Sequence, residues 1–223
     1  MINTNPITMF NDRADAARQL AKALTGYSGS NVVVLGIPRG GVEVAYHVAK
    51  ALHADFSVVV VRKLGYPENP ETAFGAIAED GSVYLSEEAG SVVSKEEMTQ
   101  IINAEKAEIQ RRIKLLRKDR PLPDLSGRTV IIVDDGIATG ATLFSALFLC
   151  RKRRPAKIIV AAPVASQRME NILKKQVDGV VILEKPAQFY AVGQGYKHFE
   201  NLSDEQTTSF IQAWENDRVQ NAS

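Results

Sequence analysis

The chain of 223 residues is poor in several residue types on which particular functions depend. Its single cysteine, Cys150, can form neither an internal disulfide nor a cysteine-based zinc site. Its three histidines, His47, His53 and His198, do not show the spacing of metal ligands. The 27 Lys and Arg residues nearly balance the 26 Asp and Glu residues, for a formal net charge of +1. Bulk charge therefore does not favour nucleic acid, and we expect no nucleic-acid partner.

Long apolar stretches are also missing. No segment is apolar over the roughly 18 residues that a membrane span needs. The most apolar stretch, residues 129–150, contains Asp134 and Asp135. The first ten residues lack the basic and apolar regions of a signal peptide. We therefore expect a soluble, cytoplasmic protein with no membrane partner.

Short, continuous apolar runs alternate with amphipathic segments along the chain. Such runs are typical of strands buried on both faces, as in a parallel sheet. The five expected strands are residues 32–35, 56–61, 130–133, 157–162 and 180–183. The expected helices are residues 12–24, 42–52, 95–118, 140–153, 168–175 and 204–217. This order predicts an α/β fold, with one domain over residues 1–223 and a doubly wound, mainly parallel five-stranded sheet flanked by helices.

Residues 64–120 do not fit this alternation. Pro67 and Pro70 indicate a loop over residues 65–70. A β-hairpin is expected from residues 73–85, and the charged helix follows it. We interpret the whole segment as an insertion into the sheet fold.

The segment after the third expected strand carries the most specific signal. Asp134 and Asp135 end a buried strand, where unliganded acids are costly, and a small-residue loop then opens a helix. Carboxylates suit ribose hydroxyls, and loop amides at a helix N-terminus suit a phosphate. The candidate phosphate loop consists of Gly136, Ile137, Ala138, Thr139, Gly140, Ala141 and Thr142. It lacks the lysine of a Walker loop, and the alternative is that the acids simply cap a helix.

Two further segments could contact anions. Residues 38–41, Pro38-Arg39-Gly40-Gly41, follow the first strand; the glycines expose amides, and Arg39 is a bidentate donor to oxyanions. Arg62 and Lys63 are expected at the carboxyl end of the second strand. The alternatives are an ordinary turn between strand and helix and a pair of solvated strand-end charges.

Residues 130–142 closely resemble the signature of type I phosphoribosyltransferases. Over nearly the whole chain, the order of motifs is most similar to the bacterial and archaeal group of predicted phosphoribosyltransferases. The resemblance implies that Asp134 and Asp135 bind the ribose of phosphoribosyl pyrophosphate and that residues 136–142 bind its 5-phosphate. It also implies that residues 38–41, with Arg62 and Lys63, bind pyrophosphate.

The family's mobile catalytic loop would be residues 64–85, and its base-binding hood residues 184–203. Phe189 or Tyr190 would then stack on a nucleobase, unless both fill the core. Ala138 stands where 6-oxopurine transferases carry an acidic general base, so the resemblance does not predict hypoxanthine or guanine as the acceptor. A homodimer is a further expectation from the family.

The implied reaction transfers ribose 5-phosphate to a nucleobase or another nitrogen nucleophile and releases pyrophosphate. Its catalytic residues would be Asp134, Asp135, Lys63 and Arg39. Mg²⁺ would be the cofactor, held by the two aspartates directly or indirectly. The alternative is a non-catalytic regulator that binds phosphoribosyl pyrophosphate or a nucleotide. Its basic stretches, residues 111–120 and 151–154, would contact a protein or nucleic acid, whereas the simpler interpretation is that they are solvated helix ends.

Overall fold

The computed structural model describes residues 9–29, 31–86 and 88–221, and a five-stranded sheet lies at its centre. The strand order is β2-β1-β6-β7-β8, and every neighbouring pair is parallel. The strands are β1 (Val32–Gly36), β2 (Asp55–Val58), β6 (Thr129–Val133), β7 (Lys157–Val164) and β8 (Gly179–Glu184). The predicted α/β fold with a parallel five-stranded sheet is confirmed.

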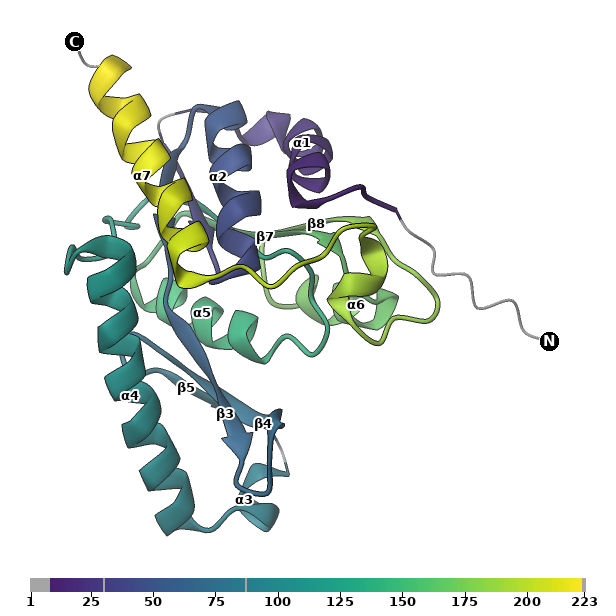
Figure 1. Cartoon of the computed structure of the whole chain (residues 1–223). Coiled ribbons are helices and arrows are strands. Elements are labelled where there is room, and N and C mark those ends of the chain that lie inside the picture. The colour runs from purple at the N-terminus through teal and green to yellow at the C-terminus, as the bar shows by residue number, and fades with distance from the viewer. Residues whose placement is uncertain (1–8, 30, 87, 222–223) are drawn as a thin grey trace.

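Helices cover both faces of this sheet, because successive residues of a strand point to opposite sides. Val32 and Val34 pack in one buried cluster, whereas Val33 and Leu35 pack in the other. The first face carries α1 (Arg13–Ala23), α2 (Gly40–Leu52) and α7 (Asp204–Asn221). The second face carries α5 (Ala141–Lys152) and α6 (Gln167–Leu173), as Figure 1 shows. Two single turns of 3-10 helix occupy Thr25–Tyr27 and Val192–Gly195.

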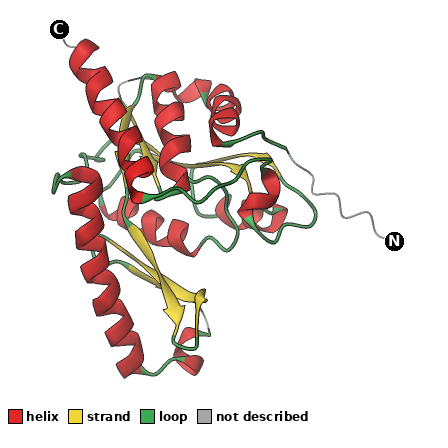
Figure 2. Ribbon diagram, viewed as in Figure 1, coloured by secondary structure: helices red, strands yellow, loops and turns green. Residues whose placement is uncertain are grey.

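Residues 61–117 form a separate layer, which we call the arm. It consists of a three-stranded antiparallel sheet, a short helix and a long helix, and it extends away from the central sheet in Figures 1 and 2. Its elements are β3 (Val61–Tyr66), β4 (Asn69–Ala78), β5 (Val83–Leu85), α3 (Ala89–Val92) and α4 (Lys95–Arg117). Strands β4 and β5 confirm the predicted hairpin.

The arm corrects two sequence predictions. The run expected as one strand over residues 56–61 ends at Val58, and the chain enters the second sheet at Val61. Arg62 and Lys63 therefore begin an antiparallel strand instead of ending a parallel one. The loop predicted for residues 65–70 is shorter than expected: only residues 67 and 68 form a turn, because β3 continues to Tyr66 and β4 begins at Asn69. The β3–β4 register is irregular here, with shifts between Leu64 and Gly65 and between Gly65 and Tyr66.

A buried ion pair joins the end of α4 to the core. Arg117 donates from Nη2 to Glu79 at 2.7 Å and from Nη1 to the Val58 carbonyl at 3.1 Å. Both charged side chains are 7% exposed. The interpretation of this basic stretch as a solvated helix end is therefore wrong at Arg117, which anchors the arm beside the point where β2 ends.

None of the helices in the described part of the chain is long and apolar enough to cross a membrane.

Candidate active site

The loop after β6 surrounds a small cavity at the carboxyl edge of the parallel sheet. The cavity has a volume of about 220 Å³. Segments far apart in the sequence converge on it, namely the loop after β1, the start of β3 and the segment near residue 192. Its lining comprises Ile37, Pro38, Arg39, Gly40, Lys63, Asp134, Asp135, Gly136, Ile137, Ala138, Thr139, Gly140, Thr142 and Val192. Most of the predicted ribose, phosphate and pyrophosphate residues thus lie in one place; Gly41, Arg62 and Ala141 are outside this lining.

Asp134 is a half-buried carboxylate of the site. Its Oδ1 accepts a hydrogen bond from the Asp135 amide at 2.9 Å. Burial raises the pKa of Asp134 well above its ordinary value, and the neighbouring charge of Asp135 raises it further. Lys63 opposes this shift by its positive charge. An unliganded Asp134 is therefore costly to ionise, whereas a hydroxyl or cation ligand would stabilise its charged form.

Arg13 is a site residue that sequence reasoning missed. Its Nε lies 2.7 Å from Asp135 Oδ2, and its side chain is only 6% exposed. Its Nη1 donates to the Glu200 carbonyl at 2.9 Å, and its guanidinium carbon lies 4.1 Å from the Phe199 ring centroid. Burial raises the pKa of Asp135, and Arg13 opposes that rise. The available signal was a cation at the first residue of a helix, where the helix dipole disfavours positive charge.

The segment of residues 38–41 contacts the two aspartates through its glycines. Helix α2 begins at Gly40, two residues earlier than predicted, and the Pro38–Arg39 peptide bond is cis. A Cβ atom at Gly41 would lie 2.9 Å from the Asp134 Cα, so only glycine permits this approach. Arg39 is exposed beside them. Within the described residues, the side chains of Arg39 and Lys63 have no hydrogen-bond or ion-pair partner, so their N–H donors are available to a ligand in the cavity.

The substitution Gly41→Ala tests the close approach of Gly41 to the backbone of Val133 and Asp134. We expect it to cost about 1–3 kcal/mol of unfolding free energy, because the added methyl must displace the backbone at Val133 and Asp134. Urea unfolding measures the change. Gly90→Ala is the matched control, since nothing lies within 4 Å of a Cβ there, and it should leave stability equal or slightly higher. Equal stability of Gly41→Ala and wild type would contradict the close approach.

The structure does not bring the predicted base-stacking residues to the cavity. Phe189 is half-buried and packs against the small cluster around Phe10 and Tyr196. Tyr190 is 78% exposed. Val192 lines the cavity instead, from the segment that follows.

A second cavity, of about 370 Å³, adjoins the first and shares Pro38, Arg39, Gly40, Asp135 and Val192 with it. Its remaining lining is Arg13, Arg62, Arg112, Phe199, Asn201 and Leu202. Arg62 therefore faces this second cavity and not the first.

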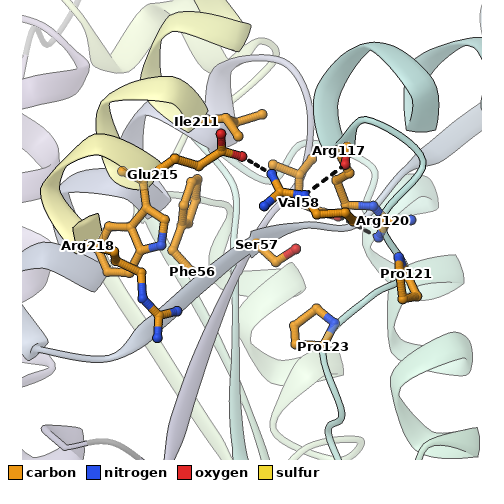
Figure 3. Close-up of a pocket in the computed structure, with 11 residues that line it drawn as sticks. Phe56, Ser57, Val58, Arg117, Arg120, Pro121, Pro123, Ile211, Glu215 and Arg218 are labelled. Atoms are coloured by element: carbon orange, nitrogen blue, oxygen red, sulfur yellow. Dashed lines mark hydrogen bonds and ion pairs between the residues drawn. The ribbon is translucent and has the colours of Figure 1, made fainter. Parts of the chain in front are cut away.

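A larger groove of about 490 Å³ lies between β2, the end of α4 and α7 (Figure 3). It contains three arginines, but each pairs with an acid of the same chain. The pairs are Arg117 with Glu79, Arg120 with Glu215, and Arg218 with Asp55. The arginines of this groove thus all have ion-pair partners, unlike Arg39 and Lys63, and none of the predicted pyrophosphate, ribose or phosphate residues lines it.

Asp134 and Asp135 are the carboxylates available to a metal at the first cavity. Among the residues with described positions, no group of three or more His, Cys, Asp and Glu side chains could hold a metal ion. Mg²⁺ is commonly bound by one or two carboxylates together with substrate phosphates and water. The donor set therefore fits Mg²⁺ that arrives with a phosphorylated ligand, with Asp134 as the carboxylate not engaged by arginine.

Comparison with known proteins agrees with this geometry. Residues 7–200 match the family model described as a phosphoribosyl transferase domain. The chain is 45% identical over 205 residues to a Mycobacterium tuberculosis protein named "Putative phosphoribosyl transferase". That match covers 91% of this chain and 46% of the relative, so the chain spans about half the relative's length.

A crystal structure of the protein TT1426 from Thermus thermophilus is also similar. The two are 38% identical, with a TM-score of 0.78 over 93% of this chain and 99% of that one. The family model covers most of the chain, and a solved relative has the same fold over nearly its full length. The chain therefore belongs to the phosphoribosyl transferase domain family.

Proposed function

We propose that the chain transfers ribose 5-phosphate from phosphoribosyl pyrophosphate to a nitrogen nucleophile and releases pyrophosphate. One observation carries this proposal. The first cavity combines two largely buried carboxylates, a loop of small and hydroxyl residues at a helix N-terminus, and the two cations without partners. Hydroxyls, a phosphate and a pyrophosphate are the groups that these three elements suit.

The loop of residues 136–142 would hold the 5-phosphate. Gly140, at the N-cap of α5, has φ of 76°, so the loop passes through a left-handed position just before the helix begins. The free amides of the first helical turn are then available to an anion. Thr139 and Thr142 line the same cavity and add hydroxyl donors.

Asp134 would accept hydrogen bonds from the ribose hydroxyls and fix the sugar in the cavity. The nucleophile attacks ribose C1 while the bond from C1 to the pyrophosphate oxygen breaks, and pyrophosphate leaves with the electron pair. Arg39, Lys63 and the amides of Gly40 and Gly41 would stabilise the charge that develops on the leaving group. Asp134 would hold Mg²⁺ together with the substrate, and the ion would supply further neutralisation of the pyrophosphate charge.

The first cavity offers no evident general base that could deprotonate the acceptor. Among the described residues that line the first cavity, carboxylates and imidazoles are limited to Asp134 and Asp135, and Ala138 has no ionisable group. We therefore propose an acceptor that attacks without prior deprotonation by the protein.

The proposal is tested in two steps on the full chain. Isothermal titration calorimetry with phosphoribosyl pyrophosphate and Mg²⁺ should show binding. Pyrophosphate release should then be measured with a panel of nucleobases and amines. Binding without turnover by any acceptor would contradict the transferase and favour the non-catalytic regulator. Absence of binding would contradict both.

A further inference from the structure

The arm places two arginines in the second cavity, and one of them, Arg112, belongs to the basic stretch of residues 111–120. Arg62 comes from β3 and Arg112 from the middle of α4. Both line the second cavity together with Arg13 and Arg39. Three of these four arginines pair with acids, namely Arg13 with Asp135, Arg62 with Glu105 and Arg112 with Glu108. A guanidinium group has five N–H donors, so an arginine that is paired at one edge can still bind an anion with its remaining nitrogens.

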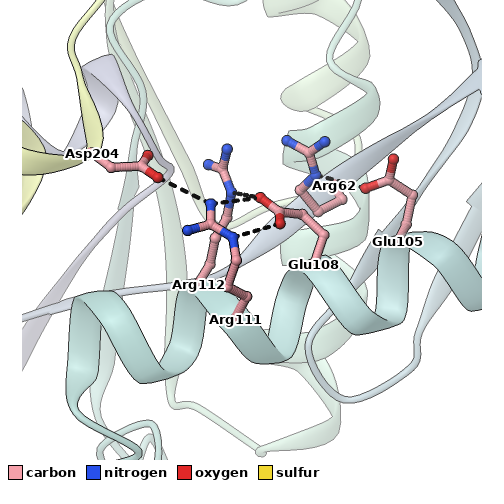
Figure 4. Close-up of polar contacts among 6 residues, drawn as sticks. All are labelled: Arg62, Glu105, Glu108, Arg111, Arg112 and Asp204. Carbon is pink, nitrogen blue, oxygen red and sulfur yellow. Dashed lines mark hydrogen bonds and ion pairs between the residues drawn. The ribbon is translucent and has the colours of Figure 1, made fainter.

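Acidic residues of α4 hold both guanidinium groups by one edge. Glu105 accepts from Arg62 Nε at 2.7 Å, and Glu108 accepts from Arg112 Nε at 2.8 Å. Within the described part of the chain, the terminal nitrogens of Arg62 and Arg112 have no hydrogen-bond partner. Figure 4 shows these nitrogens directed away from the carboxylates. Each arginine is therefore oriented at Nε and has two nitrogens available to a ligand.

Glu108 is itself fixed from a second side. Arg111 donates to it from Nε at 2.7 Å and from Nη2 at 2.9 Å, and it also reaches Asp204 at the start of α7 at 3.0 Å. Hydrogen bonds from Arg111 first, and also from Arg112, lower the pKa of Glu108 to about 2. Glu108 thus stays ionised at neutral pH and holds Arg112, which is only 12% exposed.

We propose that the arm completes the leaving-group side of the site, with Arg62 and Arg112 binding the pyrophosphate oxygens of the substrate and Glu105 and Glu108 acting as positioning residues. The inference rests on the proposed function, because the anion in the second cavity is the pyrophosphate of the ligand whose ribose 5-phosphate lies in the first. The two cavities share Arg39 and Gly40, so a single ligand can extend across both.

The test compares three ligands by calorimetry on the full chain, each with Mg²⁺. Arg112→Ala should lower the affinity for phosphoribosyl pyrophosphate and for inorganic pyrophosphate by roughly 10- to 100-fold, because charge-assisted hydrogen bonds are lost. Ribose 5-phosphate, which lacks the leaving group, should bind as it does to wild type. Glu108→Gln keeps the side-chain shape and should weaken the same two ligands by a smaller factor. Lys114→Ala removes a positive charge from an exposed position of the same helix and should change none of the affinities.

Three results would overturn the inference. Wild-type affinity of Arg112→Ala and Glu108→Gln for pyrophosphate would remove these residues from the binding site. An equal loss of affinity for ribose 5-phosphate would indicate that the substitutions damage the whole site, and not that these residues contact the leaving group. Failure of the wild-type chain to bind phosphoribosyl pyrophosphate or ribose 5-phosphate would instead reject the proposed function, and the inference with it.

Discussion

Asp134→Asn is expected to make the folded chain more stable at neutral pH while it abolishes binding of phosphoribosyl pyrophosphate. The asparagine Oδ1 can still accept the Asp135 amide, so local packing is kept. What disappears is a buried negative charge beside a second carboxylate. The same charge is needed for the ribose hydroxyls and Mg²⁺, so affinity should fall by roughly 100-fold or more.

The pH dependence follows from the direction of the pKa shift. The pKa of Asp134 is higher in the folded chain than in the unfolded chain, so the folded state binds more protons between the two values. Stability from this group is therefore fully present below the unfolded pKa of about 3.9 and is lost as pH rises toward the folded pKa. Each pKa unit between the folded and the unfolded chain corresponds to about 1.4 kcal/mol of unfolding free energy.

Urea unfolding of wild type and Asp134→Asn across a pH series measures this effect. The stability gain of the variant should be largest at neutral pH and should vanish near pH 4, roughly the ordinary pKa of a carboxyl group. Glu96→Gln, at an exposed position of α4, is the control and should leave ligand binding unchanged. A variant less stable than wild type at pH 7 would contradict the cost of the buried Asp134 charge, and a variant that keeps its affinity would contradict its role as a ligand.

Arg13→Met is expected to destabilise the chain by about 3 kcal/mol or more, because it leaves the Asp135 carboxylate buried without its partner. The loss should lower Tm by roughly 6–12 °C for a chain of this length. The contacts of Arg13 with Glu200 and Phe199 disappear as well, so the segment after η2 (Val192–Gly195) loses a contact with α1.

A double-mutant cycle separates the ion pair from the other contacts. Arg13→Met combined with Asp135→Asn should be more stable than Arg13→Met alone, since the unpaired charge is gone. Arg18→Ala is the control on the same helix. Its side chain is 65% exposed in a surface pair with Asp15, and its loss should cost about 1 kcal/mol at most. Additive effects of the two site substitutions would contradict a direct pair.

Local sequence patterns were sufficient to predict the strands of the central sheet and the position of the loop after β6. Residues 130–133 are apolar at every position, which is typical of a strand buried on both faces of a sheet. The pattern could not show where one apolar run changes sheets. Residues 58–61 are all valine, and the break after Val58 depends on tertiary contacts, including the hydrogen bond of the Val59 amide with the Gly36 carbonyl.

The arginines of the site were harder to predict, because their positions also depend on tertiary contacts. Arg13 begins a helix and Arg112 belongs to the basic stretch of residues 111–120, but neither pattern identifies the partner or the cavity, which distant segments form. Asp135 is 122 residues from Arg13 along the chain. No periodicity within a single segment carries information about such a pair.

The close contact of Gly41 with Asp134 also bears on how this site can change in evolution. A methyl group at position 41 would meet both the Asp134 Cα and the Val133 carbonyl at 2.9 Å. The constraint on position 41 therefore comes from a segment more than ninety residues away in the sequence. Because both of these atoms belong to the backbone, it does not depend on the side chain at position 134, and we expect a glycine at position 41 even in family members that lack this aspartate.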